Sequence, residues 1–157
     1  QSGQLRSASA RVMNKHRDFV VAAIVRGRDE PRELLLELRN DNQPYAGMWL
    51  LPAGKIEESD ESPTDTLRRE LKEELGFTTL GSVPLKAVDV PEYGTTCYPF
   101  VVICDQTPKC LSAKELRWDR YDTYLDVGEM PIAASNYRYK VRKALDVYFN
   151  GGLPFDM

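Results

Sequence analysis

The chain has 157 residues, of which 42% are hydrophobic and 29% are charged, a balance typical of one globular domain with a hydrophobic core. Its formal net charge is -3, from 21 basic and 24 acidic residues, so no excess of positive charge indicates a nucleic acid or an anionic membrane as partner. The only histidine is His16 and the spacing of the cysteines matches no zinc signature, which argues against a His-rich metal site and against Ser-His-Asp catalysis.

The first residues, 1–15, are polar and Ser-rich and contain no hydrophobic stretch, so we do not expect a signal peptide there. We interpret residues 1–15 as an N-terminal extension, of which 1–12 can be a cloning remnant, and residues 16–157 as a single domain. No stretch is long and apolar enough to span a membrane. Together with an odd number of cysteines, which favours free thiols in a reducing compartment, this predicts a cytoplasmic location.

The first half of the domain alternates strand patterns with turns. Residues 18–26 (DFVVAAIVR) are apolar and rich in Val, which predicts a buried strand. Residues 33–39 (ELLLELR) are ambiguous by pattern, but their short length between two turns favours a strand. After a loop at 40–47, rich in Asn, Asp, Pro and Gly, we expect a short strand at 49–52 that runs into Ala53-Gly54.

The clearest helix signal follows. Ser62 is a hydroxyl N-cap, Pro63 suits the first helical position, and Asp65 places an acidic side chain in the first turn. Gly76 then stands where a left-handed cap costs little. The sequence therefore predicts a helix over residues 63–75, with one apolar stripe formed by Leu67, Leu71 and Leu75.

Beyond this helix we expect three strands, at residues 85–90, 96–105 and 115–121. Residues 137–149 (YRYKVRKALDVYF) predict a closing amphipathic helix, which ends at Asn150-Gly151-Gly152. Strands on both sides of one helix, with a second helix at the end, indicate an α/β layered domain with a mixed β-sheet.

Three carboxylates share one side of the helix at 63–75. Glu70, Glu73 and Glu74 fall within an arc of roughly 100°, since successive residues of a helix turn by about 100°. Carboxylates held this close repel one another, and hard divalent cations such as Mg²⁺ or Mn²⁺ relieve the repulsion. Arg69 can pair with one of them and fix its rotamer. On the helix alone, a solvated face of Arg–Glu pairs explains the pattern as well as a metal site does.

The turn before the helix decides between these interpretations. Gly54, an acidic residue near position 61, and the run RELKEELGF over residues 69–77 together resemble the Nudix box. The helical half matches at every fixed position, with Phe77 in the last apolar slot. The first half departs from the pattern, which has five residues between its glycine and its first glutamate. That spacing selects Asp60, whereas the seven residues between Glu61 and Arg69 favour Glu61, which we prefer.

The resemblance to the Nudix hydrolase family extends from residue 18 to residue 149. Residues 45–52 (YAGMWLLP) look like the family's approach to the box, and residues 115–118 (ELRW) look like its later acidic strand. It implies an α/β/α sandwich and Mg²⁺-dependent hydrolysis of nucleoside diphosphate-linked substrates by a pyrophosphohydrolase. It also implies metal ligands, namely Glu70, Glu73, Glu74 and the backbone carbonyl of Ala53. Glu61 and Arg69 look like the partners that hold the helix carboxylates in place.

The general base stays open at this point. Among the box glutamates Glu73 is our first choice, and in other relatives a glutamate from a later loop does this work, for which Glu115 and Glu92 are candidates. Each of these two glutamates is equally well read as a surface carboxylate.

The substrate is less defined than the reaction. The candidates for stacking on a base are Trp49, Tyr45, Tyr93 and Tyr98, and Arg39 is the candidate for contacting a phosphate, although core or surface packing explains each of them too. The position of Tyr93 looks like the diadenosine polyphosphate class, while Pro91 and the Pro-Ala-Gly turn look like the ADP-ribose class. The run Gly47-Met48-Trp49 looks like enzymes acting on nucleoside di- and triphosphates, including oxidised ones, and we favour this class.

Two further expectations concern partners. A non-catalytic nucleotide-sensing module is the alternative from another class, but relatives of that kind usually carry a damaged box, and the helical half is complete here. Relatives are often homodimers, so the resemblance implies a homodimer, with a small nucleotide rather than RNA as ligand.

Overall fold

The computed structural model describes residues 12–26, 32–78, 81–121 and 136–151 of the chain. Most of the expected N-terminal extension therefore lies outside the described residues. None of the helices that the structure describes combines the length and apolar character that crossing a membrane requires. The three cysteines, Cys97, Cys104 and Cys110, are free.

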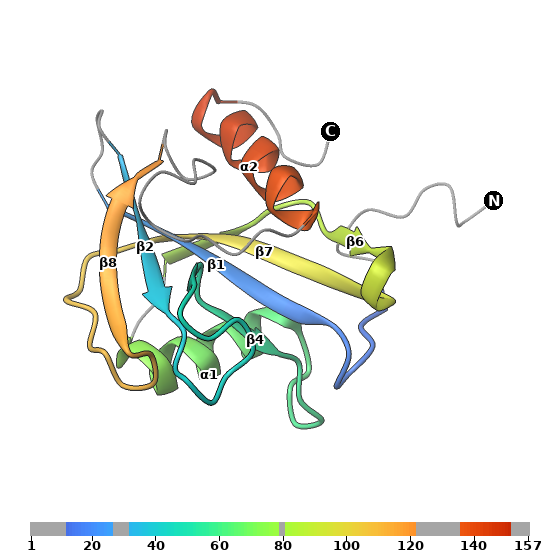
Figure 1. The fold of residues 1–157 in the computed structure, drawn as a ribbon. Helices are drawn as coiled ribbons and strands as arrows, with labels where there is room; N and C mark the ends of the chain where they lie inside the picture. Colours follow the sequence, from blue (N-terminus) through green and yellow to red (C-terminus); the bar gives the residue numbers. More distant parts are fainter. Residues whose placement is uncertain (1–11, 27–31, 79–80, 122–135, 152–157) are drawn as a thin grey trace.

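One mixed sheet of eight strands forms the middle of the molecule (Figure 1). Its main order is β3-β2-β1-β7-β5, while β4 pairs with β1, β6 with β7, and β8 with β2. β1 and β7 are parallel over seven residue pairs, and the other pairings are antiparallel. The strands are β1 (Phe19–Arg26), β2 (Glu33–Leu38), β3 (Trp49–Leu50), β4 (Ala53–Lys55), β5 (Gly81–Pro84), β6 (Val88–Val90), β7 (Thr95–Ile103) and β8 (Glu115–Arg120).

Two helices cover opposite faces of this sheet, α1 (Pro63–Leu75) on one and α2 (Asn136–Phe149) on the other (Figure 1). β1 shows why both faces are apolar, because successive side chains of a strand point to opposite sides. Its even-numbered residues pack in the cluster that holds the leucines of α1, and its odd-numbered residues pack with Val141, Ala144 and Leu145 of α2. The α/β/α sandwich expected from the sequence is confirmed.

Both helices and most strands lie where the sequence predicts them, and the helix at 63–75 matches residue for residue. Two strand predictions were wrong in detail. The expected strand at 85–90 is only β6, and β5 precedes it; proline at position 84 has no N–H for the ladder, and β5 ends there. Similarly, the strand expected at 49–52 is only β3, because the chain leaves β2 after Leu50, and a separate strand, β4, joins β1 from Ala53 onward.

Candidate active site

The ends of α1 are fixed by local hydrogen bonds. The N-cap Ser62 hydroxyl accepts from the Asp65 N–H at 3.2 Å, and the Asp65 carboxylate accepts from the N–H of Glu61, the residue before the N-cap, at 3.1 Å. Gly76 is left-handed with φ 70°, and its N–H donates to the Lys72 carbonyl at 3.0 Å. Because the leucine stripe is buried against the sheet, the direction of the neighbouring carboxylates is set as well.

Gly54 allows Glu70 to approach the sheet. A Cβ at position 54 would lie 2.2 Å from the Cδ of Glu70, a distance that real atoms do not adopt. Only glycine therefore lets the Glu70 carboxyl lie against β4, beside the backbone that Ala53 and Gly54 share. This is a physical reason for the glycine that begins the box.

Arg69 lies among four acidic side chains. Its guanidinium binds both oxygens of Asp60, at 3.2 and 2.8 Å, and donates to Glu70 at 2.8 Å. It also lies 3.2 Å from Glu57 and 3.8 Å from Glu73. These contacts hold the Glu70 side chain at β4, so Arg69 has the orienting position expected for it.

The partner of Arg69 is Asp60, and our preference for Glu61 was wrong. Asp60 is buried, and besides Arg69 it accepts from the Thr66 hydroxyl and the Glu57 N–H, both at 2.9 Å. The Arg69 hydrogen bonds are the main reason that the pKa of Asp60 lies well below its usual range. Glu61 is exposed and precedes the N-cap. The extra residue of this chain is thus accommodated after the acidic position and not before it.

The three helix glutamates differ in environment. Glu74 is buried, Glu70 is half-buried, and the Glu73 side chain is 61% exposed. Burial, together with the neighbouring carboxyls of Glu70 and Glu37, raises the pKa of Glu74 to about 10. Without a cation, Glu74 therefore holds a proton at neutral pH.

Glu37 is a residue of this site that the sequence did not reveal. It lies on β2 with 1% of its surface exposed, within hydrogen-bonding reach of the Glu74 carboxyl. Burial raises its pKa, and Arg39, whose Nη1 donates to Glu37 Oε1 at 3.2 Å, opposes that rise. One oxygen of each buried carboxylate, Glu37 and Glu74, has no donor when both are ionised.

The chemistry of the acidic side chains around α1 suits the binding of a divalent cation. As the side chains stand, no three His, Cys, Asp or Glu residues within the described ranges are grouped so as to hold an ion. Carboxylate oxygens are nevertheless the ligands that hard cations take, and two of them here are buried without a partner. The Glu74 proton occupies a place that a cation can take, since metal binding displaces protons from its ligands. Glu70, Glu73, Glu74 and the Ala53 carbonyl are the groups that would hold it.

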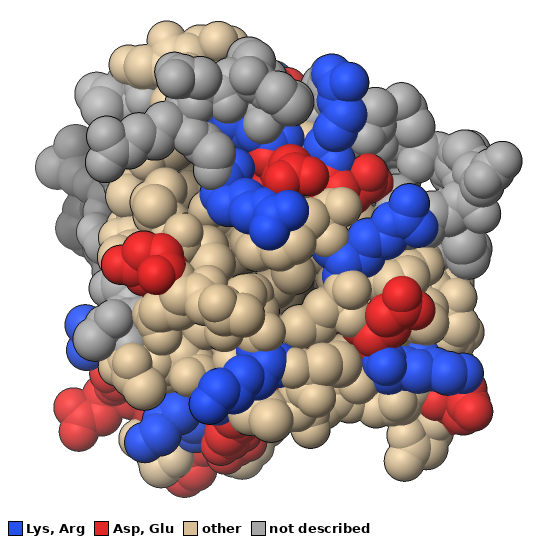
Figure 2. Space-filling view, turned by 90° about the vertical axis from the view of Figure 1, so that its left-hand side faces the viewer, with Lys and Arg blue, Asp and Glu red and all other residues tan. Residues whose placement is uncertain are grey.

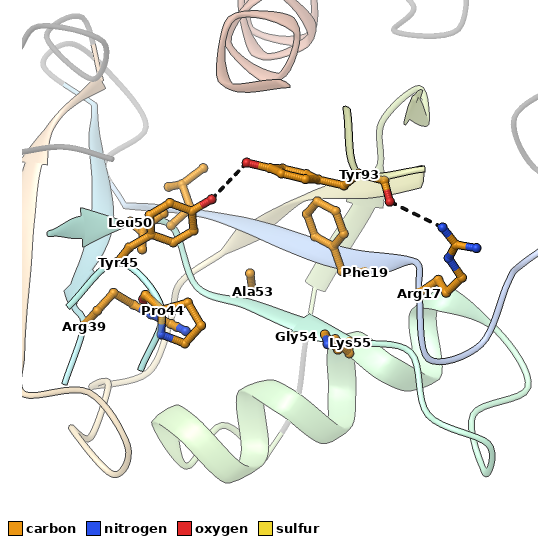
Figure 3. Close-up of a pocket in the computed structure, with 11 residues that line it drawn as sticks. Arg17, Phe19, Arg39, Pro44, Tyr45, Leu50, Ala53, Gly54, Lys55 and Tyr93 are labelled. Atoms are coloured by element: carbon orange, nitrogen blue, oxygen red, sulfur yellow. Dashed lines mark hydrogen bonds between the residues drawn. The ribbon is translucent and has the colours of Figure 1, made fainter. Parts of the chain in front are cut away.

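A cavity of about 260 Å³ (Figure 3) meets the acidic group through two of its lining residues, Gly54, which lies against Glu70, and Arg39, which contacts Glu37. Its floor is apolar, and the hydroxyls of Tyr45 and Tyr93 lie 3.1 Å apart across it. Arg39 reaches from the cavity to Glu37, and its Nε donates to the Pro44 carbonyl at 3.3 Å. The cavity is lined by Arg17, Phe19, Arg39, Pro44, Tyr45, Leu50, Leu51, Ala53, Gly54, Lys55 and Tyr93.

The other expected site residues lie as follows. Arg39, Tyr45 and Tyr93 line the cavity. Trp49 and Tyr98 are each 7% exposed and pack in the core, Trp49 on the α2 side and Tyr98 on the α1 side, and neither is among the residues that line the cavity. Glu115 is exposed at the start of β8, opposite Leu38. Glu92 belongs to the short 3-10 helix η3 (Pro91–Tyr93), and its side chain lies outside the described residues.

Comparison with known proteins identifies the class. The model of the NUDIX domain family matches residues 15–132, and the chain belongs to this family, the Nudix hydrolases. It is accordingly a pyrophosphohydrolase by class, and the family works with divalent metals on small nucleotide substrates. No curated protein matches the chain.

Solved structures with the same fold are distant in sequence. The NUDIX domain of Shewanella oneidensis NrtR, solved with ADP ribose, is 23% identical, with a TM-score of 0.66 over 87% of this chain and 90% of that chain. MutT, from a study of the Aliivibrio salmonicida and Vibrio cholerae proteins, is 20% identical, with a TM-score of 0.66 over 83% and 97%. A mutT/nudix family protein from Listeria innocua is 18% identical, with a TM-score of 0.67 over 88% and 97%.

Proposed function

We propose that the protein hydrolyses a phosphoanhydride bond of a nucleoside di- or triphosphate, oxidised ones included, with Mg²⁺ and releases a nucleoside monophosphate. Mn²⁺ can replace Mg²⁺. The observation that carries the proposal is that an apolar cavity edged by Tyr45 and Tyr93 shares two residues with the acidic group. Gly54 lines the cavity and lies against the Glu70 side chain of α1, and Arg39 lines it and contacts Glu37 of β2. An aromatic base and a chain of phosphates joined to it need these two environments side by side.

In this arrangement Tyr93 and Tyr45 contact the base, and Arg39 contacts a phosphate. Arg39 suits this role because its guanidinium is planar and because Arg39 both lines the cavity and pairs with Glu37. Glu70, Glu73, Glu74 and the Ala53 carbonyl hold the cation, and Arg69 keeps Glu70 against β4. A bound divalent cation neutralises phosphate charge and lowers the pKa of bound water.

Glu73 is our first candidate for the general base. Its side chain is the most exposed of the three helix glutamates, so it can meet a water molecule from solvent. We expect Glu73→Gln to lower kcat by at least about 10²-fold, in keeping with the loss of a general base. Its thermal unfolding should match that of the wild type, and near-normal turnover would transfer the role to Glu115 or Glu92.

ADP-ribose is the second candidate substrate. One structure of this fold was solved with that ligand, and Pro91 and the Pro-Ala-Gly turn favour it in the sequence. Dinucleoside polyphosphates follow, on the position of Tyr93. RNA is disfavoured, since acidic and basic side chains are interspersed on the face that carries β8 and β2 (Figure 2).

A substrate panel tests the proposal. The protein is incubated with Mg²⁺ and nucleoside triphosphates, oxidised nucleotides, ADP-ribose or diadenosine polyphosphates, and nucleoside monophosphate release is measured. Turnover of one class with release of the monophosphate supports hydrolysis. Tight binding of one compound without turnover of any would instead favour the nucleotide-sensing module. A homodimer and a cytoplasmic location stay predictions.

A further inference from the structure

Glu37 stands outside the Nudix box, yet it lies in the middle of the acidic group. It is on β2, and residues 39–62 separate β2 from α1 in the sequence. Its side chain faces the α1 side of the sheet, as does that of Leu35 two residues earlier. With 1% exposure it is the most buried of the acidic residues in the described part of the chain.

The two oxygens of Glu37 have different surroundings. Oε1 accepts from Arg39 at 3.2 Å, while Oε2 is buried without a hydrogen-bond partner. The facing Glu74 carboxyl also has a buried oxygen without a partner, and Glu70 lies close enough to interact with both electrostatically. Two carboxyls from different elements of the fold thus lie within hydrogen-bonding reach of each other, and each has a buried oxygen without a donor when both are ionised.

Folding does not require this arrangement. A buried carboxylate beside other carboxylates is costly, and apolar residues of similar volume usually replace buried charges without loss of stability. The one cation in hydrogen-bond contact with Glu37 in the described part of the chain is Arg39, which also donates to the Pro44 carbonyl. Arg69 is engaged by Asp60 and Glu70 and does not contact Glu37. When both carboxyls are ionised, the negative charge of Glu37 and Glu74 thus exceeds the positive charge that Arg39 places there.

We propose that Glu37 is a further carboxylate of the divalent-cation site, supplied by β2 and directed at the ion through the oxygen that now lacks a partner. The inference rests on the proposed function for the identity of the cation site. Because Glu37 also holds Arg39, it joins the cation to the guanidinium that contacts the phosphate. The site then depends on a strand residue that the helix motif does not contain.

The test is Mn²⁺ binding to the full chain without nucleotide, followed by electron paramagnetic resonance of the free ion. Glu37→Gln keeps the shape of the side chain and removes its charge, and we expect a 10–100-fold weaker Mn²⁺ affinity. Glu37→Met is the second variant, expected to bind as weakly, and it tests the inference even if Glu37→Gln folds poorly. The matched control is Glu33→Gln on the same strand, whose carboxylate pairs with Arg26 at 2.8 Å and should leave the affinity unchanged.

The outcomes separate the two proposals. Wild-type affinity in folded Glu37→Gln and Glu37→Met, verified by thermal unfolding, would overturn the role of Glu37 and leave the proposed function intact. Absence of Mn²⁺ binding by the wild-type protein would contradict the metal-dependent reaction itself. A loss of affinity in Glu33→Gln as large as in Glu37→Gln would show a general charge effect and also overturn the inference.

Discussion

Asp60 provides the sharpest test of how the acidic loop supports α1. Its carboxylate is buried and accepts two hydrogen bonds from Arg69, one from Thr66 and one from the Glu57 N–H. Breaking a buried ion pair by removing one partner costs about 3–5 kcal/mol. Asp60→Asn keeps one acceptor oxygen, and Arg69 keeps Glu70 as a partner, so we expect a loss of roughly 2–3 kcal/mol in the free energy of unfolding.

Urea unfolding at pH 7 measures this difference, with Glu61→Gln as the matched control. Glu61 is exposed, so its substitution should change the free energy of unfolding by less than about 0.5 kcal/mol. A cost for Glu61→Gln equal to or greater than that for Asp60→Asn would refute the assignment of Asp60 as the partner of Arg69. So would a cost for Asp60→Asn below about 0.5 kcal/mol.

The pH dependence of stability tests the Asp60–Arg69 ion pair in a second, independent way. The pKa of Asp60 is lowered in the folded state, so the stability it contributes is present above the unfolded pKa, about 4. That contribution is lost as the pH falls below about 4 toward the folded pKa. The difference between wild type and Asp60→Asn should therefore be constant from pH 6 to 8 and shrink as the pH falls below about 4.

Three further predictions concern the carboxylates and the core. Gly54→Ala should lower kcat/KM by at least about 10²-fold by displacing Glu70, while Gly81→Ala, where a Cβ meets nothing within 4 Å, should not. Trp49→Phe should cost about 1–3 kcal/mol in urea unfolding and leave the KM for nucleotide unchanged, because Trp49 packs in the core. Glu74→Gln should raise the Tm of the metal-free protein at pH 8 and not at pH 4. The pKa of Glu74 is raised in the folded state, so this residue costs stability as the pH rises above its pKa in the unfolded chain. A Tm at pH 8 equal to that of the wild type would contradict this.

The parts of the structure that the sequence predicts best are those decided by neighbouring residues. The helix at 63–75 matches because Ser62, Pro63, Asp65 and Gly76 act within a few residues of its ends. The strand β1 is predicted by its own composition. The assignment of Glu61 was wrong because counting residues cannot tell on which side of the acidic position an extra residue is accommodated. That depends on the turn from Glu57 to Asp60, which closes through the Asp60 N–H and the Glu57 carbonyl.

Glu37 is a second residue whose position could not be predicted from the sequence pattern alone. Residues 35, 37 and 39 alternate along β2 and its end, and the sequence places Leu, Glu and Arg there. In a sheet with one solvated face this order is typical of a strand that leaves the core, with its last charged residues in water. β2 instead pairs with β8 along one edge, and apolar clusters cover both of its faces, so the charge at 37 remains inside. Burial of a carboxylate at that point is informative only once α1 is known to place Glu74 opposite it. The two halves of the acidic group, one on a strand and one on a helix, become a single site through the fold alone, which is why the Mn²⁺ affinity of Glu37→Gln tests the tertiary structure and not the motif.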